Sequence, residues 1–267
     1  MKIHPNVILD FDDDIAASKR EPREVSSLYG RLMLENGNKF SESLHLYPRF
    51  IVGSGYLKEY LLTRRPELSS DNVLVVPTCV DYERHASHYY PEDKTKRTLG
   101  WVGIPENLVQ LDFLIPILNR LAESFTFELL IISSRPYQPE GALFEVVNLT
   151  WDWSHEIAYL QKIDVGLMPL EDTPAARGKC GFKLIQYMGL GIPAIGSAVT
   201  VNKEIIASKD MGWLVITPNE WENALVDALS MSPELLARMG ARARLHVEKN
   251  YSFTANFENY KSFVSSE

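Results

Sequence analysis

Residues 176–197 constrain the fold of this chain more than any other stretch. The sequence ARGKCGFKLIQYMGLGIPAIGS begins as a basic loop that contains glycine and continues as a helix over about residues 182–190. Gly191 stands at the expected end of the helix, and residues 193–195 form a short apolar run typical of a strand. A helix that leads directly into such a strand is typical of an α/β protein with a parallel sheet.

The start of this helix is predicted to bind an anion. Backbone N–H groups at a helix start and the positive end of the helix dipole point to one place, and glycine lets a phosphate approach the backbone closely. Arg177, Lys179 and Lys183 add three cations near Gly181, which indicates a diphosphate. A surface helix with solvated lysines explains the same residues, and the pattern alone leaves both interpretations open.

Composition and charge exclude several classes of protein. A length of 267 residues suits two small domains or one large one, and the net charge of −8 argues against a general nucleic-acid binder. The acidic N-terminus is unlike a signal peptide, and no apolar run reaches the roughly 18 residues that span a bilayer, so we expect a cytoplasmic protein. Cys79 and Cys180 are too few for a disulfide framework and lack metal-ligand spacing, so neither cysteine is expected to bind a metal.

Three adjacent carboxylates follow the first apolar segment. Residues 6–11 read as a buried strand that ends in Asp12, Asp13 and Asp14. In open α/β sheets, ligands lie at the carboxyl ends of the strands. The triplet could therefore bind a divalent metal, cap the following segment, or supply a carboxylate to an active site.

Strands and helices alternate along the rest of the chain. This alternation predicts parallel sheets with helices on both faces. The expected strands are residues 49–54, 73–77, 99–103, 127–133, 146–151, 164–170, 193–195 and 212–216. The expected helices are residues 26–40, 55–64, 107–123 with an interruption near Pro116, 154–163 with Ser154 as N-cap, 182–190, 202–208, 220–229, 233–249 and 253–263.

The segment around Gly181 resembles the donor-binding segment of the GT-B glycosyltransferases of family 4. That pattern is a Gly-rich loop, Phe, a helix with Glu-Ala-Met or Glu-Tyr-Met, and then Gly-x-Pro-Val-Ile, and it matches Phe182, Gln186-Tyr187-Met188 and residues 191–195. The two glutamates of the family, which contact the donor sugar and the ribose, would fall on Gly178 and Gln186. Gln186 can still hydrogen-bond a ribose hydroxyl, without charge assistance.

The resemblance implies an α/β protein of the GT-B type, with two Rossmann-like domains, parallel sheets and an incomplete N-terminal domain. The expected domains are residues 1–97 on the acceptor side, 98–250 for the nucleotide-sugar donor, and 251–267 as a terminal helix that returns to the N-terminal domain. Family members carry further segments ahead of residue 6. Either the chain is a fragment, or the domain has shrunk, or a partner chain or homodimer completes it.

The function that the resemblance implies is a retaining glycosyltransferase that moves a sugar from a nucleotide diphosphate sugar to a glycan or lipid-linked acceptor, as in polysaccharide biosynthesis. Asp12 or Asp13 would be catalytic, because they stand where many members place a catalytic histidine. Family members hold the diphosphate with an arginine at the position of Ile104, so here Lys179 and Lys183 are the candidate cations. The expected donor-binding residues are Gly103, Arg177, Lys179, Gly181, Phe182, Lys183 and Gln186.

The alternative is a non-catalytic nucleotide-sugar-binding half that acts only with a partner subunit. The missing glutamates and N-terminal segments favour it. Neither hypothesis needs a cofactor beyond the donor substrate, and neither involves nucleic acid. A peripheral contact with the inner face of the membrane is compatible with both.

Overall fold

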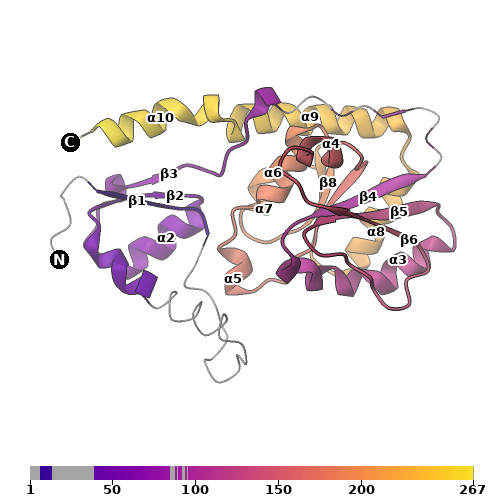
Figure 1. The fold of residues 1–267 in the computed structure, drawn as a ribbon. Helices are drawn as coiled ribbons and strands as arrows, with labels where there is room; N and C mark the ends of the chain where they lie inside the picture. The colour runs from indigo at the N-terminus through magenta and orange to yellow at the C-terminus, as the bar shows by residue number, and fades with distance from the viewer. Residues whose placement is uncertain are drawn as a thin grey trace, which may run out of the picture. The chain divides into compact units, whose positions relative to one another are not determined.

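The computed structural model describes residues 7–13, 39–84, 88, 90–91, 94 and 96–266 (Figure 1). The chain forms two compact units, of which unit 1 comprises Met1–Cys79, Asp172–Cys180 and Thr254–Glu267. Unit 2 comprises Val80–Glu171 and Gly181–Phe253. Asp14 and most of the helix expected over residues 26–40 lie outside the described part of the chain.

Unit 1 contains a parallel sheet with the strand order β1-β2-β3. Its strands are β1 (Ile8–Phe11), β2 (Arg49–Val52) and β3 (Val73–Val75), and its helices are α2 (Gly55–Arg64), α5 (Pro174–Arg177) and α10 (Phe253–Ser265), with short 3₁₀ turns at Leu44–Leu46 and Ser70–Asn72. Helix α2 begins at Ser54, whose hydroxyl accepts a hydrogen bond from the Leu57 N–H. The core is apolar, and Phe50, Leu57 and Leu61 are fully buried in it.

Strand β1 differs from the buried strand that its sequence predicts. Only Phe11 is buried, and Asp10 is exposed. Among the described residues β1 pairs with β2 alone, so it is an edge strand. Edge position explains why a run of apolar residues can end in several carboxylates without burying them.

Helix α10 contacts the start of β2. The Arg49 guanidinium donates to the Ser266 carbonyl at 2.7 Å and lies over the Phe263 ring, 4.2 Å from its centroid. Both contacts lie within unit 1, so the last helix of the chain packs on the sheet that the first strands form.

Unit 2 contains a six-stranded sheet with the order β6-β5-β4-β7-β8-β9, in which every pair is parallel. The strands are β4 (Arg97–Val102), β5 (Phe127–Ser133), β6 (Glu145–Thr150), β7 (Val165–Met168), β8 (Ala194–Ser197) and β9 (Gly212–Val215). The chain runs outward from β4 to β6, crosses back to β7 and then runs outward to β9. This is a doubly wound sheet, and its winding direction reverses between β4 and β7.

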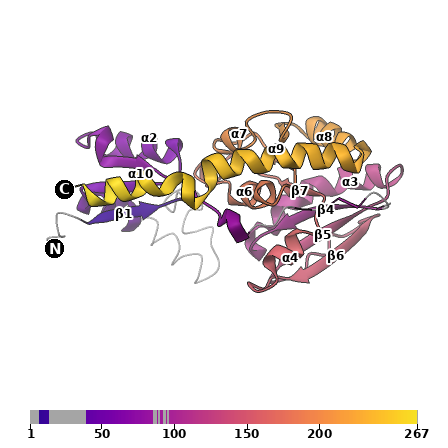
Figure 2. The same cartoon turned by 90° about the horizontal axis from the view of Figure 1, so that it is seen from above.

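The helices of unit 2 cover both faces of this sheet (Figure 2). They are α3 (Ile115–Ala122), α4 (Glu156–Leu160), α6 (Phe182–Gly189), α7 (Asn202–Ile205), α8 (Pro218–Ser230) and α9 (Pro233–Tyr251), with 3₁₀ segments at Tyr82–Arg84 and Pro105–Leu114. Helix α3 contacts α8, and α6 packs against α9. None of the helices in the described ranges is both long and apolar enough to cross a membrane.

Two sequence predictions for these helices need correction. The helix expected over residues 107–123 is a 3₁₀ segment followed by α3, which has Pro116 in its first turn, where a missing N–H costs nothing. The N-cap of α4 is His155 rather than Ser154. The Ser154 hydroxyl instead bonds to the Asp152 carboxylate.

Alternating residues of β4 pack against opposite layers. Leu99 and Trp101 belong to the core that contains the residues of α3 and α8. Gly100 faces the other way, where a Cβ would come within 2.2 Å of Ile163. The neighbouring Gly166 of β7 lies under the ring of Tyr187, which a Cβ would meet at 2.3 Å. Glycine in both strands therefore lets α6 and the segment before β7 lie close to the sheet.

Candidate functional site

The reversal between β4 and β7 opens the sheet at its carboxyl edge. These strands pair only at Leu99–Val165 and Gly100–Gly166. Beyond this point the Val102 N–H donates to the Tyr187 hydroxyl at 3.0 Å. Tyr187 is fully buried, and burial raises the pKa of its hydroxyl far above the ordinary value. Helix α6 is thus fixed at the place where doubly wound sheets bind ligands.

Tyr187→Phe is expected to lower the free energy of unfolding by about 1–3 kcal/mol, because it leaves the buried Val102 N–H without its acceptor. The measurement is denaturant or thermal unfolding of the full chain. Tyr260→Phe on the exposed side of α10 is the matched control and should change little. Equal stability of Tyr187→Phe and wild type would mean that this hydrogen bond does not anchor α6.

The N-cap of helix α6 is Gly181, which adopts a φ of +72°. A side chain there would be strained, and a Cβ would also meet the Ile205 Cδ1 at 2.3 Å. No side chain caps the first turn of α6. The backbone N–H groups of this turn therefore form an uncapped helix start of the kind that binds phosphate. Phe182, the first helical residue, is exposed.

Lys183 and Gly103 lie together at this helix start. A Cβ on Gly103 would meet Lys183 Cε at 2.9 Å and the Trp101 ring at 2.7 Å. The Lys183 ammonium nitrogen lies 5.2 Å from the centroid of that ring. Glycine at position 103 thus lets the lysine stem cross the end of β4, and the tryptophan face helps to hold the ammonium group. The sequence suggested no role for Trp101.

Gln186 lies on α6, and its side chain is 6% exposed. Its amide donates to the Glu156 carboxylate at 3.2 Å. The same Glu156 oxygen accepts from the Trp151 indole at 3.1 Å. Glu156 was not predicted as a site residue, because it precedes Gln186 by 30 positions and nothing in the local pattern pairs them. The structure thus places a partly buried carboxylate beside Gln186.

The segment after β8 has a structural role. The Asn202 amide donates to the Ser197 carbonyl at 2.9 Å, and Asn202 is buried. The Ser197 hydroxyl accepts from the Leu170 N–H at 2.8 Å, so it joins the carboxyl ends of β7 and β8. These bonds fix the position of the chain that enters and leaves the α6 region.

In unit 1, Asp12 and Asp13 lie at the carboxyl edge of the sheet, and both are exposed. The Asp12 carboxylate accepts from the Thr78 hydroxyl at 2.9 Å, and a Cβ on Gly53 would come within 2.8 Å of Asp12. The Asp13 carboxylate accepts from the Cys180 N–H at 3.2 Å. The two neighbouring acids therefore contact different segments, as alternation along an extended chain predicts.

Arg177 and Lys179 belong to the segment Asp172–Cys180, which forms part of unit 1. The Arg177 guanidinium makes two hydrogen bonds to the Asp172 carboxylate, at 2.7 and 3.1 Å. This contact raises the pKa of the Arg177 guanidinium, which is protonated at neutral pH even without it. Asp172 therefore partly offsets the positive charge of Arg177.

A doubly wound parallel sheet with helices on both faces defines an α/β domain of the Rossmann type. Residues 96–231 match the family Glycosyl transferases group 1. The chain belongs to this family. No curated protein matches the sequence.

Solved structures of GT-B glycosyltransferases share the fold. TarM of S. aureus is 15% identical with a TM-score of 0.62 over 86% of this chain and 46% of its own. Anabaena HepE in complex with UDP-glucose is 12% identical with a TM-score of 0.67 over 97% of this chain and 72% of its own. A trehalose-6-phosphate synthase, studied for glycosyl transfer with retention, is 14% identical with a TM-score of 0.63 over 96% of this chain and 67% of its own. The present chain thus spans between about half and three quarters of the length of these proteins.

Proposed function

We propose that this chain binds a nucleoside diphosphate sugar at the carboxyl edge of the unit 2 sheet and transfers the sugar, with retention of configuration, to a glycan or lipid-linked acceptor. The observation that carries the proposal is the position of Lys183. Its ammonium group lies beside Trp101 at the uncapped start of α6, at the switch point between β4 and β7.

The chemistry needs a site that stabilises the departing diphosphate. The β-phosphate gains negative charge as its bond to the sugar breaks. Positive charge at this place comes from the N–H groups of the α6 start, the helix dipole and Lys183. Gly103, Gly181 and Phe182 would line this place, with Arg177 and Lys179 as further donors from the preceding loop. Lysines and backbone amides can do this without a metal ion.

The carboxylate of Asp12 is the proposed partner of the sugar. Positive charge develops at the anomeric carbon as the donor bond breaks, and a nearby carboxylate stabilises it. Asp12 is exposed at a strand end, as such a role needs, and Asp13 is the second candidate. Retention is supported by analogy with the trehalose-6-phosphate synthase, which shares the fold.

The proposal is tested with the full chain and a panel of nucleoside diphosphates. We expect one of them to raise the thermal midpoint, and the corresponding nucleoside without phosphates to raise it much less. A diphosphate sugar with the same base should then be hydrolysed slowly in the absence of acceptor. If no member of the panel raises the midpoint, the proposal is wrong.

Members of the family have a glutamate at the position of Gln186, and it contacts the ribose of the donor. We propose that Glu156 makes this contact here. Its carboxylate keeps lone pairs beyond those used by Gln186 and Trp151, and a charged acceptor bonds a hydroxyl more strongly than an amide does. Glu156→Gln is expected to weaken nucleoside diphosphate binding by about 1–2 kcal/mol, roughly five- to thirtyfold.

The readout for Glu156 is the ratio of affinities for the ribonucleotide and its 2′,3′-dideoxy form, measured by titration calorimetry. Wild type should prefer the ribonucleotide, and Glu156→Gln should lose most of that preference. Glu123→Gln, at an exposed acid after α3, is the control and should keep it. An unchanged ratio in Glu156→Gln would remove Glu156 from the ribose site.

A non-catalytic donor-binding half is the second candidate function. The observation that favours it is the absence of both family glutamates, since Gly178 carries no side chain and the Gln186 amide bonds to Glu156. Such a protein would bind the diphosphate but would not hydrolyse the donor alone. Activity that appears only on addition of a partner chain would favour this alternative over the first.

A further inference from the structure

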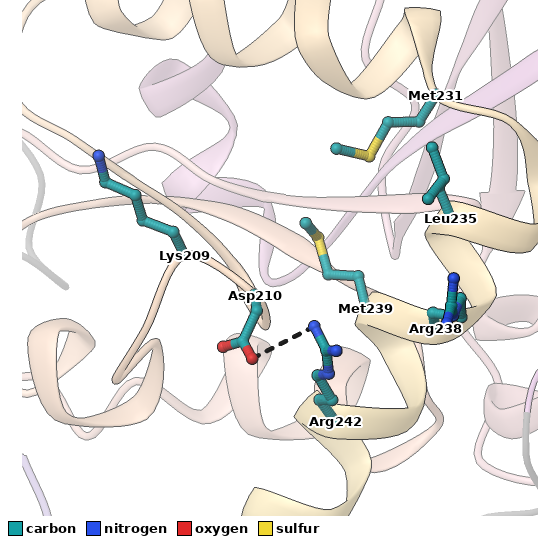
Figure 3. A pocket seen from close by; sticks show the side chains of 7 residues that line it. All are labelled: Lys209, Asp210, Met231, Leu235, Arg238, Met239 and Arg242. Carbon is teal, nitrogen blue, oxygen red and sulfur yellow. Dashed lines mark ion pairs between the residues drawn. The ribbon is translucent and has the colours of Figure 1, made fainter.

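A hollow in unit 2 lies beside the N-terminal half of α9 (Figure 3). Its volume is about 340 Å³, which is within the range of sites for small ligands. Lys209 and Asp210 line it from the turn before β9, and Met231 lines it from the turn after α8. Arg97, the first residue of β4, donates to the Met231 carbonyl at 2.9 Å, which places the hollow at the amino ends of the strands.

The lining combines an apolar floor with cations. Met231, Leu235 and Met239 supply the apolar side chains. Lys209, Arg238 and Arg242 surround them, and Asp210 is the single acid, paired with Arg242 at 3.3 Å. Neither Lys209 nor Arg238 is paired with a carboxylate among the described residues. An excess of positive charge is notable on a chain whose net charge is −8.

The same chemistry continues along α9 beyond the hollow. Residues Leu235, Arg238, Arg242, Leu245 and Lys249 follow a spacing of three and four, so they share one side of the helix. All five are exposed, and the two leucines expose 50% and 63% of their surface. Exposed leucines between arginines and lysines are typical of helices that lie in the interface of an anionic bilayer, with the apolar groups inserted and the cations at the phosphates.

We propose that the hollow and this side of α9 form a docking surface for anionic phospholipid. Charge complementarity selects the occupant, because the four cations of this surface outnumber the two neighbouring exposed acids. The cations are Lys209, Arg238, Arg242 and Lys249, and the acids are Asp210 and Glu234. A lipid phosphate would lie beside Arg238, and Leu235 and Leu245 would enter the layer of acyl chains. Lipid docking is independent of the proposed donor site, because the two share no residue.

The test is sedimentation of the full chain with vesicles. Phosphatidylcholine vesicles that contain phosphatidylglycerol should bind the protein at low salt, and pure phosphatidylcholine vesicles should not. Arg238→Glu reverses one charge and is expected to reduce the partition coefficient at least about tenfold. Leu235→Ser and Leu245→Ser should each reduce it several-fold. Both leucines are exposed, so the thermal midpoint and the affinity for nucleoside diphosphate should not change.

Matched controls separate local docking from bulk effects. Lys162→Glu makes the same charge change at an exposed residue after α4, and Leu143→Ser removes a leucine that is 71% exposed elsewhere. Both should bind vesicles as wild type does. The proposal is overturned if wild type binds neither vesicle or both equally, if the three α9 variants bind normally, or if Lys162→Glu loses as much binding as Arg238→Glu.

Discussion

Lys183→Met is expected to weaken the binding of a nucleoside diphosphate by about 1.5–3 kcal/mol, roughly ten- to hundredfold, the range for a hydrogen bond to a charged group. Methionine keeps an unbranched stem of similar length, so the end of β4 and the ring of Trp101 stay covered while the charge is lost. Alanine would confound the result, because it uncovers a tryptophan that is otherwise fully buried. Affinity is measured by titration calorimetry with the diphosphate that gives the largest thermal shift.

The discriminating comparison is with the bare nucleoside, which lacks the phosphates. Its affinity should be the same for Lys183→Met and wild type. Lys203→Met, at an exposed lysine of α7, serves as the control for loss of a positive charge and should bind the diphosphate normally. If Lys183→Met weakened both ligands equally, the lysine would not contact phosphate and the site at the α6 start would have to be abandoned.

Asp12→Asn is expected to lower turnover more than tenfold and to leave donor affinity unchanged. The amide keeps the size of the side chain and can still accept from the Thr78 hydroxyl, so the strand end should hold its geometry. What it loses is the negative charge that stabilises the positive anomeric carbon in the transition state. An effect on kcat without an effect on the dissociation constant of the donor is the signature of such a role.

Asp13→Asn is the matched control for Asp12. Its side chain accepts from the Cys180 N–H, which an amide oxygen can also do, so turnover should change little. Stability should be equal or slightly higher in both variants, because each removes one charge from a run of acids. Normal turnover in Asp12→Asn would mean that the acidic residues only form a solvated strand end and have no catalytic role. Reduced turnover in Asp13→Asn alone would assign the catalytic role to Asp13.

Local sequence pattern determined the order and type of the elements. Helix α2 was expected over residues 55–64 and is Gly55–Arg64, and β5 was expected over 127–133 and is Phe127–Ser133. The start of α6 at Phe182 was also predicted, because Gly181 marks it. These features depend on the period of apolar residues and on glycine, which act within one or two turns of chain. Parallel pairing then followed from the alternation of strands and helices.

The resemblance around Gly181 predicted the family, and the match of residues 96–231 confirms it. The nine predicted site residues stay predictions, since their roles depend on a ligand. For several of them the structure supplies an environment that the sequence did not indicate. Arg177 bonds to Asp172, Gln186 bonds to Glu156, and the stem of Lys183 crosses Gly103 toward Trp101.

Only the tertiary structure decided which distant residues meet. The Tyr187 hydroxyl reaches Val102 across 85 positions, and Glu156 reaches Gln186 across 30. The hollow beside α9 likewise brings residues 209–210 together with residues 231–242, which sequence spacing does not connect. A side-chain pattern reports which face of a helix or strand is apolar, and this follows from local geometry. It does not report which strand edges meet, because that depends on how all the buried faces pack together.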